Sequence, residues 1–211
     1  YGTTGEDKYE ELAKYIDIIQ FSLDSPDQMT YELTRGKGNY DKLIYNIALA
    51  KKAGIKNRVV SFTPTIKNIH TLRDLPKFCY DNEINGIHLS KYMPVGRAQQ
   101  NLSLKVPPEK YAEELTIFYD NYNKVNNDIR LKRQLYEIGL PEEQRSKLIM
   151  FSFADNVDNK VFSYGKRYSC GMGTNLISIN YDENIYLCPS LHHEEFKIGS
   201  IYENIDEVLA K

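Results

Sequence analysis

Apolar residues along the first 127 positions follow two alternating patterns. Short, mostly apolar runs are typical of buried strands, and they lie at residues 16–23, 59–63 and 86–94. Segments with apolar residues at helical spacing lie around these runs, at residues 6–15, 41–52, 68–82 and from Pro107 onward. Because short loops join the strands and helices in alternation, we expect parallel strands with right-handed crossovers. The pattern therefore predicts an α/β fold, either part of a barrel or an open parallel sheet.

Two residues mark the boundaries of the predicted helices. Gly54 follows the helix at 41–52, where a glycine in the left-handed conformation commonly ends a helix. Pro76 is expected in the first turn of its helix, because its missing N–H costs little there.

The rest of the chain has a different pattern. Residues 128–168 are polar and irregular, apart from a short helix expected near residues 141–147. Residues 176–180 and 184–188 are predicted to form a β-hairpin, followed by a final helix at 204–209. We therefore divide the chain into an α/β part, a linker and a small hairpin-and-helix part, at residues 1–127, 128–168 and 169–211.

Composition excludes several classes of protein. The formal net charge is -2, and no basic run offers the surface that nucleic-acid phosphates require. No apolar run approaches the roughly 20 residues of a membrane span, and no signal peptide opens the chain. Three widely spaced cysteines make a poor disulfide framework and favour reduced thiols in the cytoplasm. Since the chain starts with Tyr1 and its opening residues resemble a strand end, we expect a piece of a longer protein.

Ligands of parallel α/β folds bind at the carboxyl ends of the strands. This rule directs attention to three segments, at residues 22–24, 63–65 and 93–97. Ser22 and Asp24 place a hydroxyl and a carboxyl at one strand end, although such a pair also commonly ends a strand and starts a turn. Gly96, between Met93 and Arg97, permits close backbone approach to a ligand, and a plain strand-to-helix loop fits these residues equally well.

Cys170 and Cys188 are the candidate metal ligands. Thiolates hold iron–sulfur clusters and zinc, and a hairpin between the two cysteines can fold them back together. His192 and His193 follow closely, so a zinc site with two cysteines and a histidine is an alternative, as is a pair of unligated cysteines. Cys79 lies on the apolar face of a predicted helix and is expected in the core.

Four segments, taken in order, extend this interpretation. They are Gln-Phe-Ser-Leu-Asp at 20–24 with Arg-Gly-Lys-Gly at 35–38, Thr-Pro-Thr-Ile-Lys-Asn at 63–68, Met-Pro-Val-Gly-Arg-Ala at 93–98, and the cysteine-bearing region from 170 to 201. Together they resemble the radical S-adenosylmethionine (SAM) superfamily whose members carry a C-terminal SPASM or twitch domain. The resemblance covers nearly the whole chain and implies part of a TIM-like partial barrel, followed by the start of a SPASM-like region.

The sequence departs from this family in two respects. The family's Cys-x-x-x-Cys-x-x-Cys motif, which holds the SAM-binding [4Fe–4S] cluster, does not occur, and the resemblance places strands one to three upstream of Tyr1. In the SPASM pattern a glycine stands five residues before the second cysteine, where this chain has Glu183. The later SPASM cysteines are also absent from a chain that ends at Lys211.

The resemblance implies roles for the candidate residues. Ser22 and Arg35 would hold the SAM carboxylate, the guanidinium being suited to bidentate pairing. Asp24 would lie in the cavity near SAM or substrate, where a catalytic role is open, and Met93, Gly96 and Arg97 would lie near SAM. Cys170 and Cys188 would be two ligands of an auxiliary [4Fe–4S] cluster.

The resemblance also implies an activity. The full-length enzyme would reductively cleave SAM to a 5′-deoxyadenosyl radical that abstracts a substrate hydrogen, with an electron donor such as flavodoxin or ferredoxin, while this piece alone would be inactive. Family members with this tail often modify peptides or proteins, so such a substrate is expected. A zinc-binding or scaffold module and an ordinary barrel aldolase or isomerase are the alternatives. Since half a parallel sheet exposes an edge strand, we expect the fragment to dimerise or rearrange.

Overall fold

The computed structural model describes residues 5–92, 101–153, 177–188 and 191–209. The chain forms two compact units, residues 1–155 and 156–211, which we treat separately. The predicted boundaries at 127 and 168 stay predictions. No helix within the described ranges is both long enough and apolar enough to cross a membrane.

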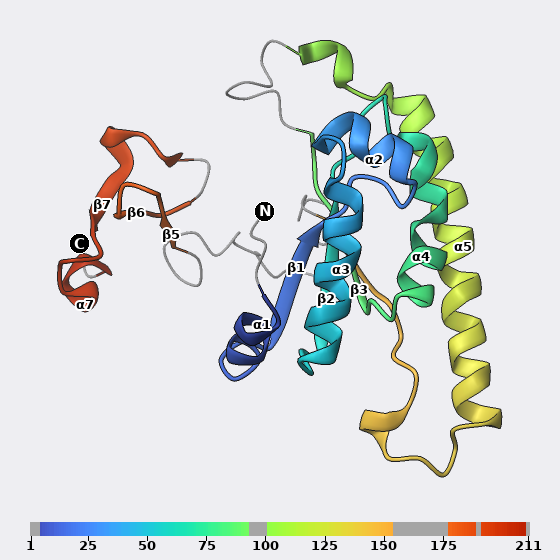
Figure 1. The fold of residues 1–211 in the computed structure, drawn as a ribbon. Helices are drawn as coiled ribbons and strands as arrows, with labels where there is room; N and C mark the ends of the chain where they lie inside the picture. Colours follow the sequence, from blue (N-terminus) through green and yellow to red (C-terminus); the bar gives the residue numbers. More distant parts are fainter. Residues whose placement is uncertain (1–4, 93–100, 154–176, 189–190, 210–211) are drawn as a thin grey trace, which may run out of the picture. The chain divides into compact units, whose positions relative to one another are not determined.

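The first unit is built on a four-stranded parallel sheet in the order β1-β2-β3-β4 (Figure 1). The strands are β1 (Ile18–Ser22), β2 (Asn57–Phe62), β3 (Gly86–Leu89) and β4 (Met150–Phe153). The helices are α1 (Glu6–Leu12), α2 (Gln28–Arg35), α3 (Asn39–Lys52), α4 (Leu75–Asp81) and α5 (Pro108–Leu135), with 3₁₀ turns η1 (Ile69–Asp74) and η3 (Glu142–Gln144). Neighbouring strands are consecutive in sequence and parallel, which confirms the predicted α/β fold.

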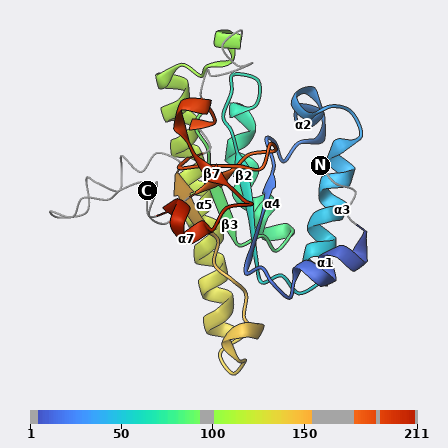
Figure 2. The ribbon, with the colours of Figure 1, turned by 90° about the vertical axis from the view of Figure 1, so that its left-hand side faces the viewer.

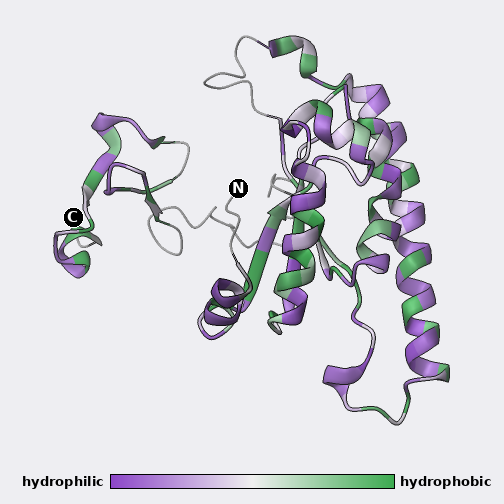
Figure 3. Ribbon diagram, in the orientation of Figure 1, coloured by the Kyte–Doolittle hydropathy of each residue, from purple (hydrophilic) through white to green (hydrophobic). Residues whose placement is uncertain are grey.

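Helices cover one face of this sheet. The helix α3 packs on β1 and β2, α4 packs on β3, and α5 packs on α4 and η1 (Figure 1 and Figure 2). The buried side chains between these layers form the core, among them Leu23, Val60, Phe62, Ile87 and Phe118. Hydrophobic and hydrophilic residues alternate along α5, as Figure 3 shows, so one stripe of this helix enters the core.

The two boundary predictions are confirmed. Gly54 has φ +81° just beyond the end of α3, in the left-handed region where a side chain is unfavourable. Pro76 lies in the first turn of α4.

The polar segment after residue 128 was predicted incompletely. The helix α5 continues to Leu135, and the irregular region contains the fourth strand, β4. Asn126 on α5 fixes the entry to this strand, because its side chain donates to Ile149 O at 3.1 Å and accepts from Ile149 N–H at 2.9 Å. The Phe118 and Phe151 rings then meet with centroids 5.0 Å apart. The strand therefore forms through contacts distant in sequence, which local periodicity cannot reveal. The sequence also missed α2, and β3 ends at Leu89 rather than at residue 94.

The second unit is a three-stranded antiparallel sheet in the order β5-β6-β7. It comprises β5 (Ser178–Ile179), β6 (Asn184–Tyr186), the 3₁₀ turn η5 (Glu194–Phe196), β7 (Lys197–Ser200) and α7 (Ile205–Leu209). The predicted hairpin around residues 181–183 is confirmed, and β7 extends it to three strands.

Candidate functional site

Ser22 is the last residue of β1 and lies at the carboxyl end of the sheet. The ladder continues one residue further, since Leu23 N–H donates to Ser61 O at 2.9 Å. The carbonyl oxygen of Ser22 accepts a 3.5 Å hydrogen bond from the Tyr31 hydroxyl. Among the described residues no partner is found for the Ser22 hydroxyl itself, so this group is available to a ligand at the strand end.

Asp24 is buried directly behind this strand end, with only 6% of its side chain exposed. One carboxylate oxygen pairs with Nε of Arg35, whose side chain is a quarter exposed. The other accepts from the backbone N–H of Thr63, just after β2, at 3.3 Å. The carboxylate therefore ties together the ends of β1, β2 and α2. The structure shows this carboxylate paired with Arg35, and the predicted role of Asp24 near SAM or substrate stays a prediction.

The burial of this cluster changes its ionisation. Burial raises the pKa of Asp24 from 3.8 to about 6, and the hydrogen bond from Thr63 opposes the rise. Burial, with the nearby charge of Asp24, raises the pKa of Tyr31 to about 12. At neutral pH the carboxylate is ionised and Arg35 is its counter-ion.

Local sequence explains how α2 presents Arg35. The side chain of Asp27 accepts from Thr30 N–H at 2.8 Å and caps the start of the helix. Gly36 follows Arg35 with φ +91°, a conformation that ends the helix there. Arg35 is thus held in the last helical turn, eleven residues after Asp24, where the two side chains meet.

Asn68 organises the adjoining loop, a role that sequence reasoning did not assign. Its side-chain amide N–H groups donate to Asp24 O at 2.8 Å and Thr63 O at 3.0 Å. Its carbonyl oxygen accepts from Thr65 N–H at 2.7 Å and from the Thr65 hydroxyl at 3.0 Å. The available signal was the pattern Thr-x-x-Asn directly after a strand, since such side chains commonly close turns.

The sheet face opposite the helices carries a polar row. Ser22, Ser61, His88 and Ser152 are partners in the strand register, one on each strand. The hydroxyl groups of Ser61 and Ser90 lie 2.9 Å apart, and His88 Nδ1 lies 3.0 Å from the Ser152 hydroxyl. Burial lowers the pKa of His88, which keeps its ring neutral at pH 7. Because parallel sheets are usually apolar on both faces, this row indicates a face suited to polar ligands.

A mostly apolar cavity of about 290 Å³ opens beside the carboxyl end of β3. Its walls include Pro64, Leu89, Tyr92 and Tyr111. The predicted SAM-proximal residues Met93, Gly96 and Arg97 follow this wall in sequence and lie outside the described residues, so their roles stay predictions.

The second unit holds Cys188, a partly buried cysteine just after β6. Its proposed partner Cys170 lies outside the described residues. Within the described ranges no group of three or more His, Cys, Asp or Glu side chains is placed to hold a metal. His192, considered for zinc, lies with Nε2 2.8 Å from the Ser178 hydroxyl and packs its ring on Tyr186.

Glu183 occupies the hairpin position where the SPASM pattern has glycine. Its φ is +65°, in the left-handed region that glycine adopts most readily. The side chain accepts a 2.6 Å hydrogen bond from the Tyr202 hydroxyl. The turn therefore keeps the conformation that glycine would favour, and the hydrogen bond from Tyr202, two residues beyond β7, offsets part of the strain.

Comparison with known proteins connects this geometry to a family. Residues 2–79 match the model of the Radical SAM superfamily, so sequence similarity relates the segment containing Ser22, Asp24 and Arg35 to that superfamily. The AdoMet-dependent heme synthase of Nitratidesulfovibrio vulgaris is 27% identical over 118 residues, which are 56% of this chain and 32% of that protein. A probable GTP 3′,8-cyclase of Sulfurisphaera tokodaii is 32% identical over 81 residues, or 38% and 26% of the two chains. The chain thus spans a third or less of these relatives' own length.

Solved structures share the fold over almost the whole chain. The complex of anSMEcpe with AdoMet and the Cp18Cys peptide superposes with a TM-score of 0.66, covering 99% of this chain and 55% of that one at 15% identity. Streptococcus suis SuiB bound to its precursor peptide SuiA gives a TM-score of 0.60, with coverages of 98% and 45% at 15% identity. The parallel sheet followed by a small antiparallel sheet therefore resembles part of the radical SAM fold.

Proposed function

We propose, from the relation of residues 2–79 to the Radical SAM superfamily, that this chain is part of a radical SAM enzyme and carries one side of its SAM site. The site lies at the carboxyl ends of β1 to β3, where ligands bind in parallel α/β folds. The observation that carries the proposal is the cluster of Ser22, Asp24 and Arg35, which the fold assembles within the matched segment.

The residues of this cluster fit the polar end of SAM. The Ser22 hydroxyl, without a partner among the described residues, donates to the SAM carboxylate. Arg35 supplies positive charge to the same group, and Asp24 and Asn68 hold Arg35 and the neighbouring loop in position. Because Asp24 is ionised at neutral pH, it orients the guanidinium and balances its charge.

The reaction requires an electron from a reduced [4Fe–4S] cluster, which cleaves SAM and supplies the radical that abstracts a substrate hydrogen. The described residues contribute binding and orientation to this chemistry. The polar row Ser22, Ser61, His88 and Ser152 offers hydrogen bonds to a polar substrate over the sheet. The hydrogen bonds between the parallel strands keep these four residues in register. Helices cover the other face of the sheet.

Cys188, with Cys170, is proposed to ligate an auxiliary [4Fe–4S] cluster. The support is the order of elements in the second unit: β5 and β6 form a hairpin, Cys188 follows, and β7 comes next, which resembles the SPASM pattern. The left-handed conformation of Glu183 adds to this support, because it preserves the turn that the pattern's glycine requires.

A peptide or protein is the proposed substrate. The support is the fold shared with anSMEcpe and SuiB, both solved with bound peptides. The enzyme is proposed to work in the cytoplasm, where a flavodoxin or ferredoxin can supply the electron.

The test uses the enzyme encoded by the full reading frame, reconstituted anaerobically with iron and sulfide. Dithionite and SAM are added and 5′-deoxyadenosine is quantified. The Kd for SAM is measured for each variant. We expect Ser22→Ala and Arg35→Lys to raise the Kd for SAM about tenfold or more, the loss expected for one charge-assisted hydrogen bond. Ser103→Ala and Arg130→Lys, on exposed positions outside the site, are the matched controls. Unchanged SAM affinity in both site variants would refute the assignment.

A further inference from the structure

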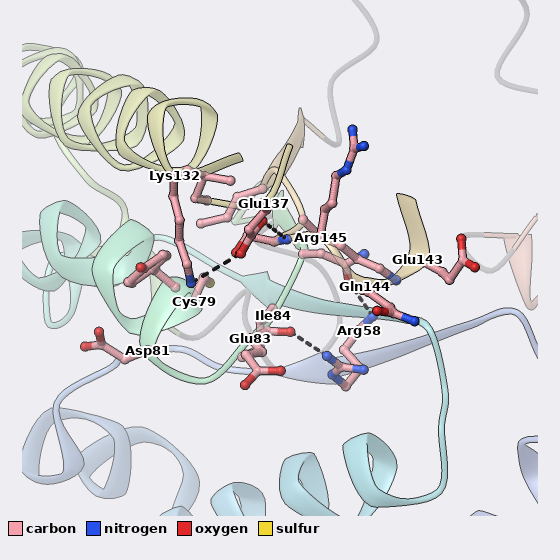
Figure 4. A pocket seen from close by; sticks show the side chains of 16 residues that line it. Arg58, Cys79, Asp81, Glu83, Ile84, Lys132, Glu137, Glu143, Gln144 and Arg145 are labelled. Carbon is pink, nitrogen blue, oxygen red and sulfur yellow. Dashed lines mark hydrogen bonds and ion pairs between the residues drawn. The ribbon is translucent and has the colours of Figure 1, made fainter. Parts of the chain in front are cut away.

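A second cavity lies at the opposite end of the sheet. It has a volume of about 630 Å³ and is bounded by the residues that precede β3 and β4, by α4, by the end of α5 and by the η3 region (Figure 4). Arg58 at the start of β2, Asn85 before β3 and Ile149 before β4 all line it. The cavity is therefore at the amino ends of the strands, away from the proposed SAM site, and its size suits a small organic molecule.

Arg58 is a buried cation in the wall of this cavity, with 8% of its surface exposed. Its guanidinium donates to Ile55 O at 2.5 Å and to Glu83 O at 2.6 Å. Its Nε has no hydrogen-bond partner among the described residues, and no ion pair with a described carboxylate neutralises it. A buried charge held only by carbonyl oxygens is costly, so the site favours a compensating anion.

Lys147 brings a second cation to the same wall. Its ammonium donates to Lys56 O at 2.8 Å. Burial and the positive charges of Arg58 and Lys56 lower the pKa of Lys147. Like charges thus gather at one side of the cavity and repel one another.

The carboxylates around the cavity are mostly engaged by other cations. Asp81 pairs with Lys77 and Glu83 pairs with Lys51, both at 2.6 Å. Glu137 lies 3.6 Å from Lys132 and accepts from both the N–H and the hydroxyl of Ser146.

Glu143 is the remaining lining carboxylate, and its position on the exposed η3 turn leaves it in solvent. In Figure 4 the pair of Lys132 and Glu137 lies apart from Arg58. No described carboxylate forms an ion pair with Arg58 or Lys147, and Glu83, whose charge opposes the lowering of the Arg58 pKa by burial, is itself paired with Lys51.

The rest of the wall is mixed, with the polar side chains of Asn85, Gln144 and Ser146 beside three isoleucines. Ile84, Ile129 and Ile149 line the cavity and are each about 2% exposed. A small ligand with one anionic group and further polar atoms would match this wall, because the charge would face the cations while the polar atoms face the amide and hydroxyl groups.

We propose that this cavity is an allosteric or accessory site for a small organic anion, whose phosphate or carboxylate group lies against Arg58 and Lys147. The inference rests on residues outside the proposed SAM site and stands or falls separately from the proposed function.

The test is calorimetric titration of the enzyme encoded by the full reading frame with inorganic phosphate and with succinate, against chloride at equal ionic strength. We expect saturable binding of phosphate, of succinate or of both, and the stronger ligand identifies the anionic group. Lys147→Gln, which removes an exposed side chain, should weaken binding about fivefold, as expected for one solvent-exposed charge contact. Arg58→Lys keeps the charge and should retain part of the affinity that Arg58→Gln loses.

Lys124→Gln and Arg130→Gln, on the exposed face of α5, are the matched controls and should bind as the unaltered chain does. Equal response to phosphate, succinate and chloride would show only general screening and would overturn the proposal. Equal weakening by Lys147→Gln and Lys124→Gln would overturn it as well, because binding would then follow net charge rather than this cavity. The effect of each variant on SAM affinity is measured in parallel and should be absent.

Discussion

The buried pair of Asp24 and Arg35 makes a pH dependence of stability that can be measured directly. The pKa of Asp24 rises from 3.8 to about 6 on folding, chiefly because burial removes water from the carboxylate. The folded state therefore keeps a proton on Asp24 at pH values where the unfolded chain has lost it. The stability gained in this way is fully present below pH 3.8 and is lost as the pH rises through about 6.

The size of this effect follows from the shift. A rise of about two pKa units corresponds to about 3 kcal/mol, since one unit is about 1.4 kcal/mol. Asp24→Asn keeps the shape of the side chain and cannot titrate, so its stability should lack this slope. The free energy of unfolding of the unaltered chain, relative to Asp24→Asn, should therefore fall by about 2–3 kcal/mol between pH 4 and pH 7.

Urea unfolding at several pH values, followed by circular dichroism, measures this difference. Asp120→Asn removes an acidic residue on α5, outside this pair, and is the control for the loss of one negative charge. A constant difference between the unaltered chain and Asp24→Asn from pH 4 to pH 7 would refute the reasoning. The pKa of Asp24 would then stay near 3.8 on folding, because the positive charge of Arg35 offsets the loss of water around the carboxylate.

Two further substitutions test other parts of the structure. Asn68→Ala removes four hydrogen bonds and leaves buried backbone groups of Asp24, Thr63 and Thr65 without partners. The free energy of unfolding, measured by urea titration, should therefore fall by about 2–4 kcal/mol. A loss below about 0.5 kcal/mol would show that water replaces the amide. Glu183→Val should destabilise the hairpin by about 1–2 kcal/mol, because a β-branched residue resists φ +65°, whereas Glu183→Gly should be nearly neutral. Hydrogen exchange of the β6 amides measures both, and equal protection in the two variants would contradict the strain argument.

The sequence resolved the positions of the helices and strands that have their own periodicity. Buried parallel strands are continuous apolar runs and α3 and α5 carry apolar stripes, so their presence follows from local spacing. Gly54 and Pro76 fixed helix ends because each constrains its own backbone. The family resemblance brought Ser22, Asp24 and Arg35 to notice, whereas the residues alone favoured a simple turn for Ser22 and Asp24.

Tertiary structure alone decided which of these groups meet and which are buried. The strand β4 exists because Asn126 and β3 hold a short segment with little pattern of its own. Asp24 became a buried partner of Arg35 because the path of α2 returns the chain to the end of β1. Arg58 and Lys147, 89 positions apart, line one cavity only because β2 and β4 belong to the same sheet. Such contacts depend on long-range packing, whereas periodicity reports only on neighbours along the chain, and this is why the fold was predictable while the geometry of its sites was not.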